Sequence, residues 1–184
     1  MNDTAPASAA GTHGRSTIKA VAFDWGGTVM EDPGTRSGPM AEWPSVNAVE
    51  GIAGALDRLA SHYLLAIATN AEDSGAELVR RALRRVGLAD RFPVVIASCE
   101  IGHRKPERAF FAALACALRC RPEEIVMVGD DYGHDVAGAH LAGLRSVWFD
   151  RTGDREPPLP AVHDGRIAAM HELPAVIASL DVRR

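Results

Sequence analysis

The sequence predicts an α/β fold, a three-layer α/β/α sandwich built around a mostly parallel sheet. Apolar runs rich in β-branched residues alternate along the chain with segments of helical period, which is the pattern of strands joined by crossover helices. With 184 residues, 47% of them hydrophobic, the chain can bury one sizeable core. These observations favour a single domain with helices on both faces of the sheet.

The elements follow one another in regular alternation. Strands are predicted at 18–23, 63–69, 93–97, 125–128 and 146–149, with a weaker one near 166–169. Helices are predicted at 46–61, 74–86, 107–118, 134–142 and 171–180. In the second helix the spacing of Val79, Leu83 and Val86 gives one apolar face, and Gly87 marks its end.

Composition excludes several classes of protein. The net charge of −4 and the absence of a basic stripe argue against a nucleic-acid binder. No apolar run has the length of a membrane span, and the three cysteines match no disulfide or zinc pattern, which fits a cytoplasmic protein. Residues 1–16 are predicted to form a disordered tail, and 17–184 the domain. Four arginines at helical spacing are predicted to form a solvated face: Arg80, Arg81, Arg84 and Arg85.

The first predicted strand ends at an aspartate and a glycine-rich turn. Residues 18–28 read IKAVAFDWGGT, so Asp24 follows the apolar run directly. Open α/β sheets bind ligands at the carboxyl ends of their strands. Asp24 is therefore a candidate nucleophile or metal ligand, although a lone aspartate there also fits a cap of the turn.

Two further strand ends carry polar groups. Thr69 and Asn70 close the second strand, where they form either an anion site at the start of a helix or ordinary caps. Lys105 follows the third strand and is, with Lys19, one of only two lysines among 20 basic residues. Its compact charge suits phosphate, and the alternative is a surface cation.

The fourth predicted strand runs into the acidic segment VGDDYGHD. Asp130, Asp131 and Asp135 lie so close in sequence that they repel one another unless a cation compensates them. Carboxylate oxygens are the ligands that Mg²⁺ prefers in proteins. The segment therefore predicts either a Mg²⁺ site or a solvated acidic turn.

Together these segments resemble the motifs of the haloacid dehalogenase-like (HAD) superfamily. FDWGGT is similar to the first motif, ATN to the second, RKP to the third and VGDDYGHDVAGAHLAG to the fourth, and the similarity covers nearly the whole chain from Ile18 onward. The resemblance implies a Rossmann-like HAD core. It also implies a Mg²⁺-dependent phosphohydrolase or phosphotransferase that acts on phosphomonoesters through an aspartyl-phosphate.

The resemblance assigns a role to each motif residue. Asp24 is the expected nucleophile, Thr69 binds a phosphoryl oxygen, and Lys105 offsets the negative charge. The expected positions of substrate binding are Gly27, Thr28 and Asn70. The expected Mg²⁺ ligands are Asp24, the carbonyl of Gly26 and Asp130, with Asp131 or Asp135 as a further ligand or an outer partner.

Gly26 departs from the family pattern. In the family's phosphatases this position carries a second aspartate, which protonates the leaving group and later activates water. Because general acid–base catalysis contributes about 10²–10⁴-fold, we expect slow turnover of alkyl phosphates and a smaller loss with aryl phosphates. His103 and His134 lie in motif loops and could supply the proton, but ordinary surface histidines are the favoured interpretation. The alternative function is a weak or inactive protein that binds a phosphorylated ligand or partner.

Residues 29–45 stand where larger family members insert a cap. The segment is too short and too rich in Pro and Gly for a helical cap, so we expect a flap, with Trp43 near the site entrance and no substantial cap domain. The site is then open to solvent or closed by another subunit. The expected partner is a phosphorylated substrate, either a small molecule or a macromolecule.

Overall fold

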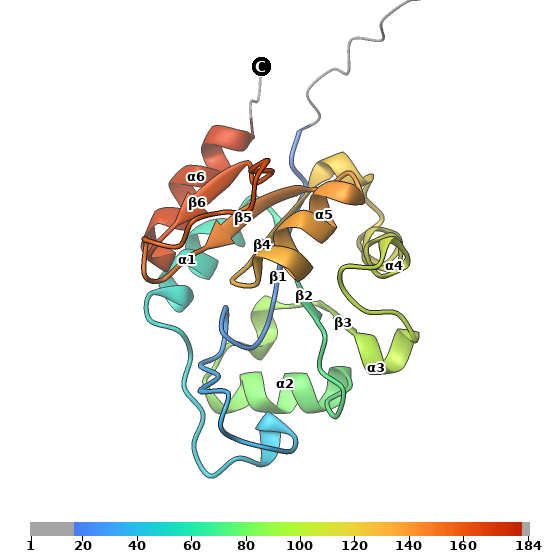
Figure 1. Cartoon of the computed structure of the whole chain (residues 1–184). Coiled ribbons are helices and arrows are strands. Elements are labelled where there is room, and N and C mark those ends of the chain that lie inside the picture. Colours follow the sequence, from blue (N-terminus) through green and yellow to red (C-terminus); the bar gives the residue numbers. More distant parts are fainter. Residues whose placement is uncertain (1–16, 182–184) are drawn as a thin grey trace, which may run out of the picture.

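The computed structural model describes residues 17–181, and the predicted N-terminal tail lies outside them. Its centre is a six-stranded sheet in the order β3-β2-β1-β4-β5-β6, in which all neighbouring strands pair in parallel (Figure 1). The strands are β1 (Ala20–Phe23), β2 (Leu64–Thr69), β3 (Val94–Ala97), β4 (Ile125–Gly129), β5 (Arg145–Phe149) and β6 (Gly165–Ile167). This is the predicted sheet, and the weaker sixth strand is part of it.

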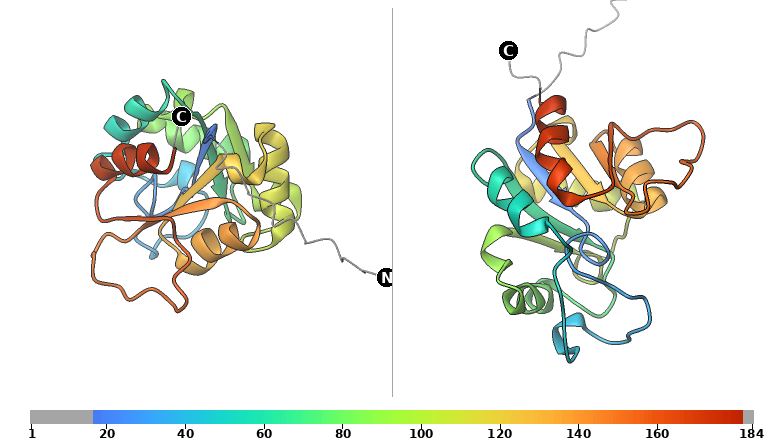
Figure 2. Two further views of the ribbon diagram at one scale, coloured as in Figure 1. Left: turned by 90° about the horizontal axis from the view of Figure 1, so that it is seen from above. Right: turned by 90° about the vertical axis from the view of Figure 1, so that its left-hand side faces the viewer.

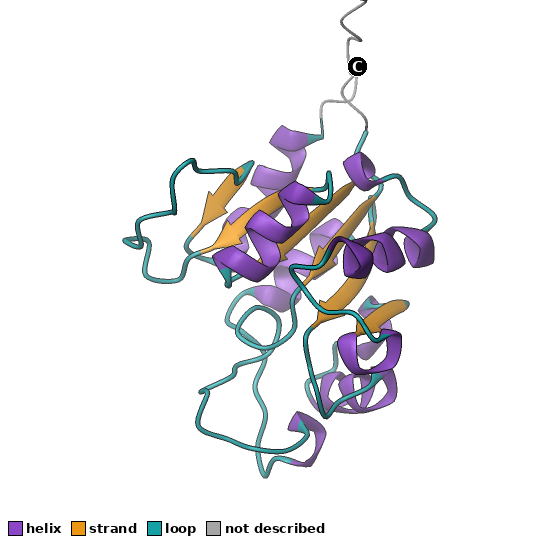
Figure 3. Cartoon of the chain, turned by 45° about the vertical axis from the view of Figure 1, so that its right-hand side comes forward, coloured by secondary structure: helices purple, strands orange, loops and turns teal. Residues whose placement is uncertain are grey.

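Helices cover both faces of the sheet, as the α/β/α prediction requires (Figures 2 and 3). The apolar contacts place α1 (Ile52–Leu59), α2 (Ala76–Arg85) and α6 (Leu173–Leu180) on one face, and α4 (Arg108–Leu118) and α5 (Gly138–Leu141) on the other. Successive residues of a strand point to opposite faces. In β1, Val21 and Phe23 face the first group of helices, while Ala20 and Ala22 face the phenylalanines of α4.

Helix α2 ends where the sequence predicts. Gly87 has a φ of +74°, a left-handed conformation that suits glycine. The amide of Leu88 donates to the carbonyl of Leu83 at 3.0 Å, which satisfies a carbonyl at the end of the helix.

The expected solvated arginine face of α2 is only partly present. Arg80 donates to the carbonyls of Phe92 and Pro93 at 2.8 and 3.0 Å. Arg85 donates to three carbonyls of the flap, which belong to Ala41, Trp43 and Pro44, at 3.2, 2.6 and 3.0 Å. Arg81, Arg84 and Arg85 are exposed, as predicted, and Arg80 is half-buried. The sequence did not show that Arg80 and Arg85 also bind backbone carbonyls, because helical spacing does not reveal which carbonyls face a helix.

The predicted helix at 46–61 begins later than expected. Helix α1 starts at Ile52, after Gly51 in a left-handed conformation with a φ of +78°. Before it, Ala48 forms a β-bridge with Met30, and the amide of Val49 donates to the carbonyl of Val29 at 2.9 Å. The spacing of Val49 and Ile52 fits a helix, but Val49 lies before the helix and pairs with the flap.

The remaining helical segments are short. The predicted helix at 134–142 begins as a π-helical turn, Tyr132–Ala137, and continues into α5. The four-residue α3 (Ser98–Ile101) was not predicted. Short 3₁₀ turns occur at Met40–Glu42, Ala89–Arg91, Pro122–Glu124 and Met170–Glu172. Within 17–181, no helix has both the length and the apolar character needed to cross a membrane.

Candidate active site

The motif residues meet at the carboxyl ends of the central strands. Asp24 follows β1, Asp130 follows β4, and Thr69 is the last residue of β2. The strand order reverses between β1 and β4, and open α/β sheets form their ligand crevice at such a point. A pocket of about 400 Å³ opens there, and Asp24, Thr69 and Asn70 are among its lining residues.

Lys105 lies at the base of this site and is 1% exposed. Its Nζ donates to Asp24 Oδ1 at 2.7 Å and to Asp135 Oδ1 at 2.6 Å. Burial alone would lower the pKa of Lys105, but the charges of Asp135 and Asp24 outweigh it and raise the pKa. Lys105 therefore keeps its positive charge, and the alternative of a surface cation is wrong.

Three carboxylates, two of them bound to this lysine, form one cluster. Asp24, Asp130 and Asp135 each offer an oxygen, and these oxygens lie within 4.8 Å of one another. Burial raises the pKa of Asp135 to about 7. The positive charge of Lys105 opposes this increase, and the negative charge of Asp24 adds to it. Burial and the charge of Asp24 also raise the pKa of Asp130. One lysine does not balance three carboxylates, so this set of hard oxygen donors fits a Mg²⁺ ion.

Asp131 and Asp135 have different positions, although both were candidate ligands. Asp131 Oδ1 accepts from the amide of His134 at 2.8 Å, and its Oδ2 lies 3.1 Å from His134 Nδ1. Asp131 therefore caps the π-helical turn at the surface, outside the cluster of three. The turn carries Asp135 inward, where its side chain is 1% exposed.

Glycines at two strand ends make room for the carboxylates. A Cβ on Gly129 would lie 2.1 Å from Asp135 Oδ2, and a Cβ on Gly27 would lie 2.7 Å from Asp130 Oδ2. Gly27 also has a φ of +83°. The sequence predicts that the glycines of the first motif let backbone approach a ligand; here they let acidic side chains approach the backbone.

Two residues of the first motif that were expected to bind substrate, Gly27 and Thr28, form hydrogen bonds within the site. The hydroxyl of the buried Thr28 donates to Asp130 Oδ1 at 3.1 Å. The amide of Gly27 donates to the carbonyl of Met30 at 2.8 Å, which closes the turn after Asp24. Both interactions hold the acidic cluster in place.

Thr69 and Asn70 do not cap a helix, because α2 begins only at Ala76. Thr69 Oγ1 accepts from the amide of Ala71 at 3.2 Å. The side chain of Asn70 accepts from the amide of Lys105 at 2.8 Å and donates to its carbonyl at 2.9 Å. Asn70 thus fixes the backbone of Lys105 from both sides.

The flap forms the outer wall of the pocket. Trp43 lines it, as predicted, and its indole N–H donates to the carbonyl of Gly38 at 3.0 Å. Asp32 and Arg36 also line it, and neither was predicted from the sequence. An acidic residue shortly after a first motif that lacks its second aspartate is the signal that could have drawn attention to Asp32.

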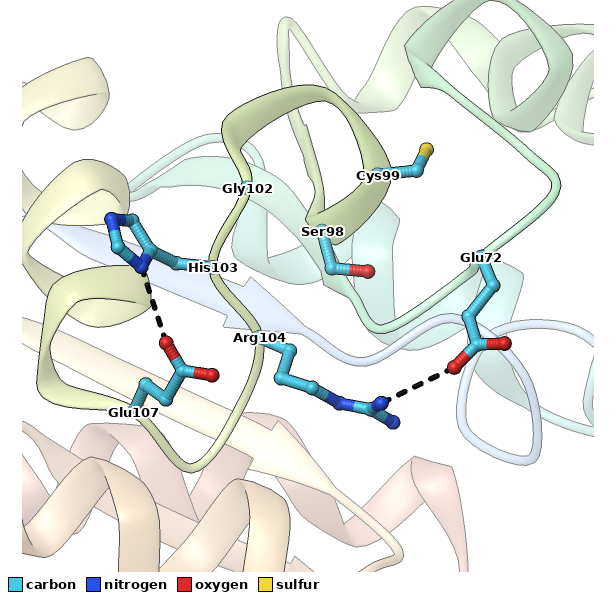
Figure 4. Close-up of a pocket in the computed structure, with 7 residues that line it drawn as sticks. All are labelled: Glu72, Ser98, Cys99, Gly102, His103, Arg104 and Glu107. Carbon is cyan, nitrogen blue, oxygen red and sulfur yellow. Dashed lines mark hydrogen bonds and ion pairs between the residues drawn. The ribbon is translucent and has the colours of Figure 1, made fainter.

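A second hollow, of about 300 Å³, lies beside the segment that carries Lys105 (Figure 4). His103 and Glu107 both line it and turn toward each other, with 3.1 Å between Nδ1 and Oε2. Arg104 reaches Glu72 at 3.2 Å. His103 does not line the pocket that contains Asp24, and neither does His134. Both histidines are exposed at the surface, as the favoured interpretation expects.

Known proteins resemble this chain in sequence. A phosphoserine phosphatase of Thermus thermophilus is 42% identical over 97 residues, which are 53% of this chain and 39% of that protein. A ribulose-1,5-bisphosphate 5-phosphatase of Halopiger xanaduensis is 44% identical over 68 residues, which are 37% of this chain and 28% of that protein. The matched segments therefore span less than half the length of these curated relatives.

The fold and the family agree with these similarities. A crystal structure of an uncharacterized protein from Listeria monocytogenes serotype 4b superposes with a TM-score of 0.80 at 26% identity and covers 89% of this chain and 98% of that one. The family model described as haloacid dehalogenase-like hydrolase matches residues 36–149, well over half of the chain. The chain belongs to the haloacid dehalogenase-like hydrolases, as its four motifs indicate.

Proposed function

We propose that this chain is a Mg²⁺-dependent phosphohydrolase that removes phosphate from a phosphomonoester through an aspartyl-phosphate on Asp24. The observation that carries the proposal is the buried Lys105, which holds Asp24 and Asp135 at 2.7 and 2.6 Å at the base of an open pocket. The positive charge of Lys105 offsets the negative charge of these carboxylates. It therefore allows a phosphoryl dianion to approach the carboxylate of Asp24. The names of the two curated relatives support the same class of reaction.

The reaction proceeds in two displacements at phosphorus. An Asp24 carboxylate oxygen attacks the phosphorus, and the bond to the leaving oxygen breaks while that oxygen takes up a proton. A water oxygen then attacks the same phosphorus, gives up a proton, and breaks the bond to Asp24, which releases inorganic phosphate. An alcohol in place of this water would make the protein a phosphotransferase.

Positive charge makes both displacements feasible. Lys105 fixes one oxygen of Asp24 and stabilises negative charge on the phosphoryl group as it transfers. Asp24, Asp130 and Asp135 would hold Mg²⁺, with the carbonyl of Gly26 as a further oxygen. When bound, the ion supplies positive charge for the phosphoryl oxygens and offsets the repulsion among the carboxylates.

Gly26 favours a second candidate function, a weak or inactive protein that binds a phosphorylated ligand or partner. Without a carboxylate at this position we expect slower turnover than in a site that carries one, above all with alkyl phosphates. The intact Asp24, Lys105 and Asp130 favour the enzyme.

The proposed substrate is a phosphorylated small molecule. The pocket of about 400 Å³ is of a size that accepts one, with the flap on one side and the loop after β2 on the other. A phosphorylated macromolecule that presents one phosphoryl group, and a second subunit that closes the site, are the alternatives for a pocket open to solvent.

The test uses p-nitrophenyl phosphate with Mg²⁺. We expect the wild type to turn over, Asp24→Asn to fall to background, and EDTA to remove the activity reversibly. Asp154→Asn, in an exposed loop, is the matched control and should behave as the wild type. Turnover that persists in Asp24→Asn would contradict the mechanism. Absence of turnover, with inorganic phosphate still raising the melting temperature, would favour the second candidate.

A further inference from the structure

The space beside Gly26 is filled by an acidic side chain from the flap. A Cβ built on Gly26 would lie 3.1 Å from Asp32 Oδ2, 3.5 Å from its Cβ and 3.7 Å from its Cγ. The carboxylate of Asp32 thus lies directly beside the place where a side chain at position 26 would begin. Asp32 and Gly26 line the same pocket as Asp24.

Short contacts on both sides hold Asp32 in this position. Its Oδ1 accepts from the amide of Gly34 at 2.8 Å, which fixes the orientation of the carboxylate. On the other side, Met30 forms β-bridges with Gly26 and Ala48, and the amide of Glu31 donates to the carbonyl of Asn47 at 2.9 Å. The chain therefore folds back from Asp24 and returns Asp32 to the entrance of the site.

The proposed reaction requires a group that first gives and then takes a proton. An alkoxide is a poor leaving group, so the first displacement needs a proton at the leaving oxygen, and the second needs an acceptor for a proton of water. Lys105 is engaged by two carboxylates, and Asp130 and Asp135 belong to the acidic cluster. Besides Asp24, the carboxylates that line the pocket are those of Asp32 and Asp73. Asp73 lies after β2 and accepts from the hydroxyl of Ser74 at 2.9 Å.

The geometry points to Asp32 as the catalytic residue that transfers protons in this site, an inference that rests on the proposed function. In the first displacement its carboxylic acid gives the proton to the leaving oxygen as the Asp24–phosphorus bond forms. In the second its carboxylate takes a proton from water as the water oxygen bonds to phosphorus and the bond to Asp24 breaks. Asp32 thereby returns to its initial protonation state. A residue of the flap thus provides the carboxyl group that Gly26 lacks.

The exposure of Asp32 sets the expected size of its contribution. The side chain is exposed and stands in a flap, so it is less rigidly held than a group on the strand end. We therefore expect the lower end of the range for general acid–base catalysis, about 10²-fold.

The first experiment compares Asp32→Asn with the wild type on two substrates, p-nitrophenyl phosphate and glycerol phosphate. The parameter kcat/KM covers the steps up to transfer to Asp24, in which only the alkyl leaving group needs a proton. We expect kcat/KM to fall about 10²-fold for glycerol phosphate and less than about tenfold for p-nitrophenyl phosphate. Asp73→Asn, the other pocket carboxylate, is the matched control and should show no such split.

The second experiment moves the carboxylate. Gly26→Asp alone should give no gain, because it places a second carboxylate beside that of Asp32 and the two like charges repel each other. In the Asp32→Asn background, Gly26→Asp should restore turnover of glycerol phosphate by at least about tenfold.

The outcomes separate this inference from the proposed function. Turnover that depends on Asp24, with an equal loss on both substrates in Asp32→Asn, overturns the role of Asp32 and leaves the phosphatase standing. A gain from Gly26→Asp that is the same with and without Asp32 overturns it as well. Absence of any turnover that depends on Asp24 overturns both.

Discussion

Replacing Lys105 by methionine tests the central electrostatic feature of the site. Lys105 is buried between Asp24 and Asp135, and each contact is shorter than 3 Å. At an effective dielectric constant of about 20, one such contact represents about 6 kcal/mol of attraction. The variant removes two of them and leaves the carboxylates facing each other.

The measured loss will be smaller than the sum of these attractions. Burying the lysine has a desolvation cost, which the variant recovers in part. Asp135 also escapes much of the repulsion by taking up a proton, because burial already raises its pKa to about 7. We therefore expect the free energy of unfolding to fall by about 3–5 kcal/mol, the range for breaking a buried ion pair by removing one partner.

The assay is urea unfolding followed by circular dichroism, at neutral pH and with EDTA present. Lys19→Met is the matched control, since Lys19 is the other lysine and pairs with Glu124 from an exposed position. It should cost less than about 1 kcal/mol. In an Asp135→Asn background the loss from Lys105→Met should shrink by about 1–3 kcal/mol. A loss below about 1 kcal/mol, or equal losses in both backgrounds, would refute the role of Lys105 as the counter-ion.

Two further predictions concern a cation and a second buried carboxylate. Saturating Mg²⁺ should raise the melting temperature more at pH 8 than at pH 6, because burial raises the pKa of Asp135 to about 7 and a bound proton competes with the ion below that pH. Equal shifts at both pH values in a thermal melt would contradict this. Burial alone would raise the pKa of Asp150, but hydrogen bonds from Arg155, Arg166 and Thr152 lower it. Asp150→Asn should therefore reduce the free energy of unfolding by about 2–3 kcal/mol in urea titrations, and a loss under about 0.5 kcal/mol would contradict it.

The sheet and the meeting of the motif residues could be predicted because both follow from local signals. β-branched runs that stop at glycine or at polar residues define strands, and parallel strands bring their carboxyl ends to one edge. Asp24 and Asp130 therefore come together although they are far apart in the sequence. Only the structure shows that Lys105 is buried, since its sequence context fits a surface cation as well as a buried one.

What the sequence could not show depends on contacts between distant segments. Val49 has the spacing of a helical residue, but it pairs with the flap, and only the fold brings those segments together. Asp32 belongs to none of the four motifs. It lies beside Gly26 because the flap turns back toward the site. Asparagine is a common helix-capping residue, yet the side chain of Asn70 forms its hydrogen bonds with the backbone of Lys105.

Backbone contacts fix the flap at both of its ends, and an exposed stretch lies between them. Before this stretch, the amide of Glu31 donates to the carbonyl of Asn47, and after it, Arg85 donates to carbonyls within 41–44. Residues 33–38, between these contacts, are exposed. Changes of length or composition in 33–38 would reshape the rim of the pocket without disturbing the strand ends. The entrance of the pocket can therefore vary among relatives while Asp24, Asp130 and Lys105 keep their positions at the strand ends.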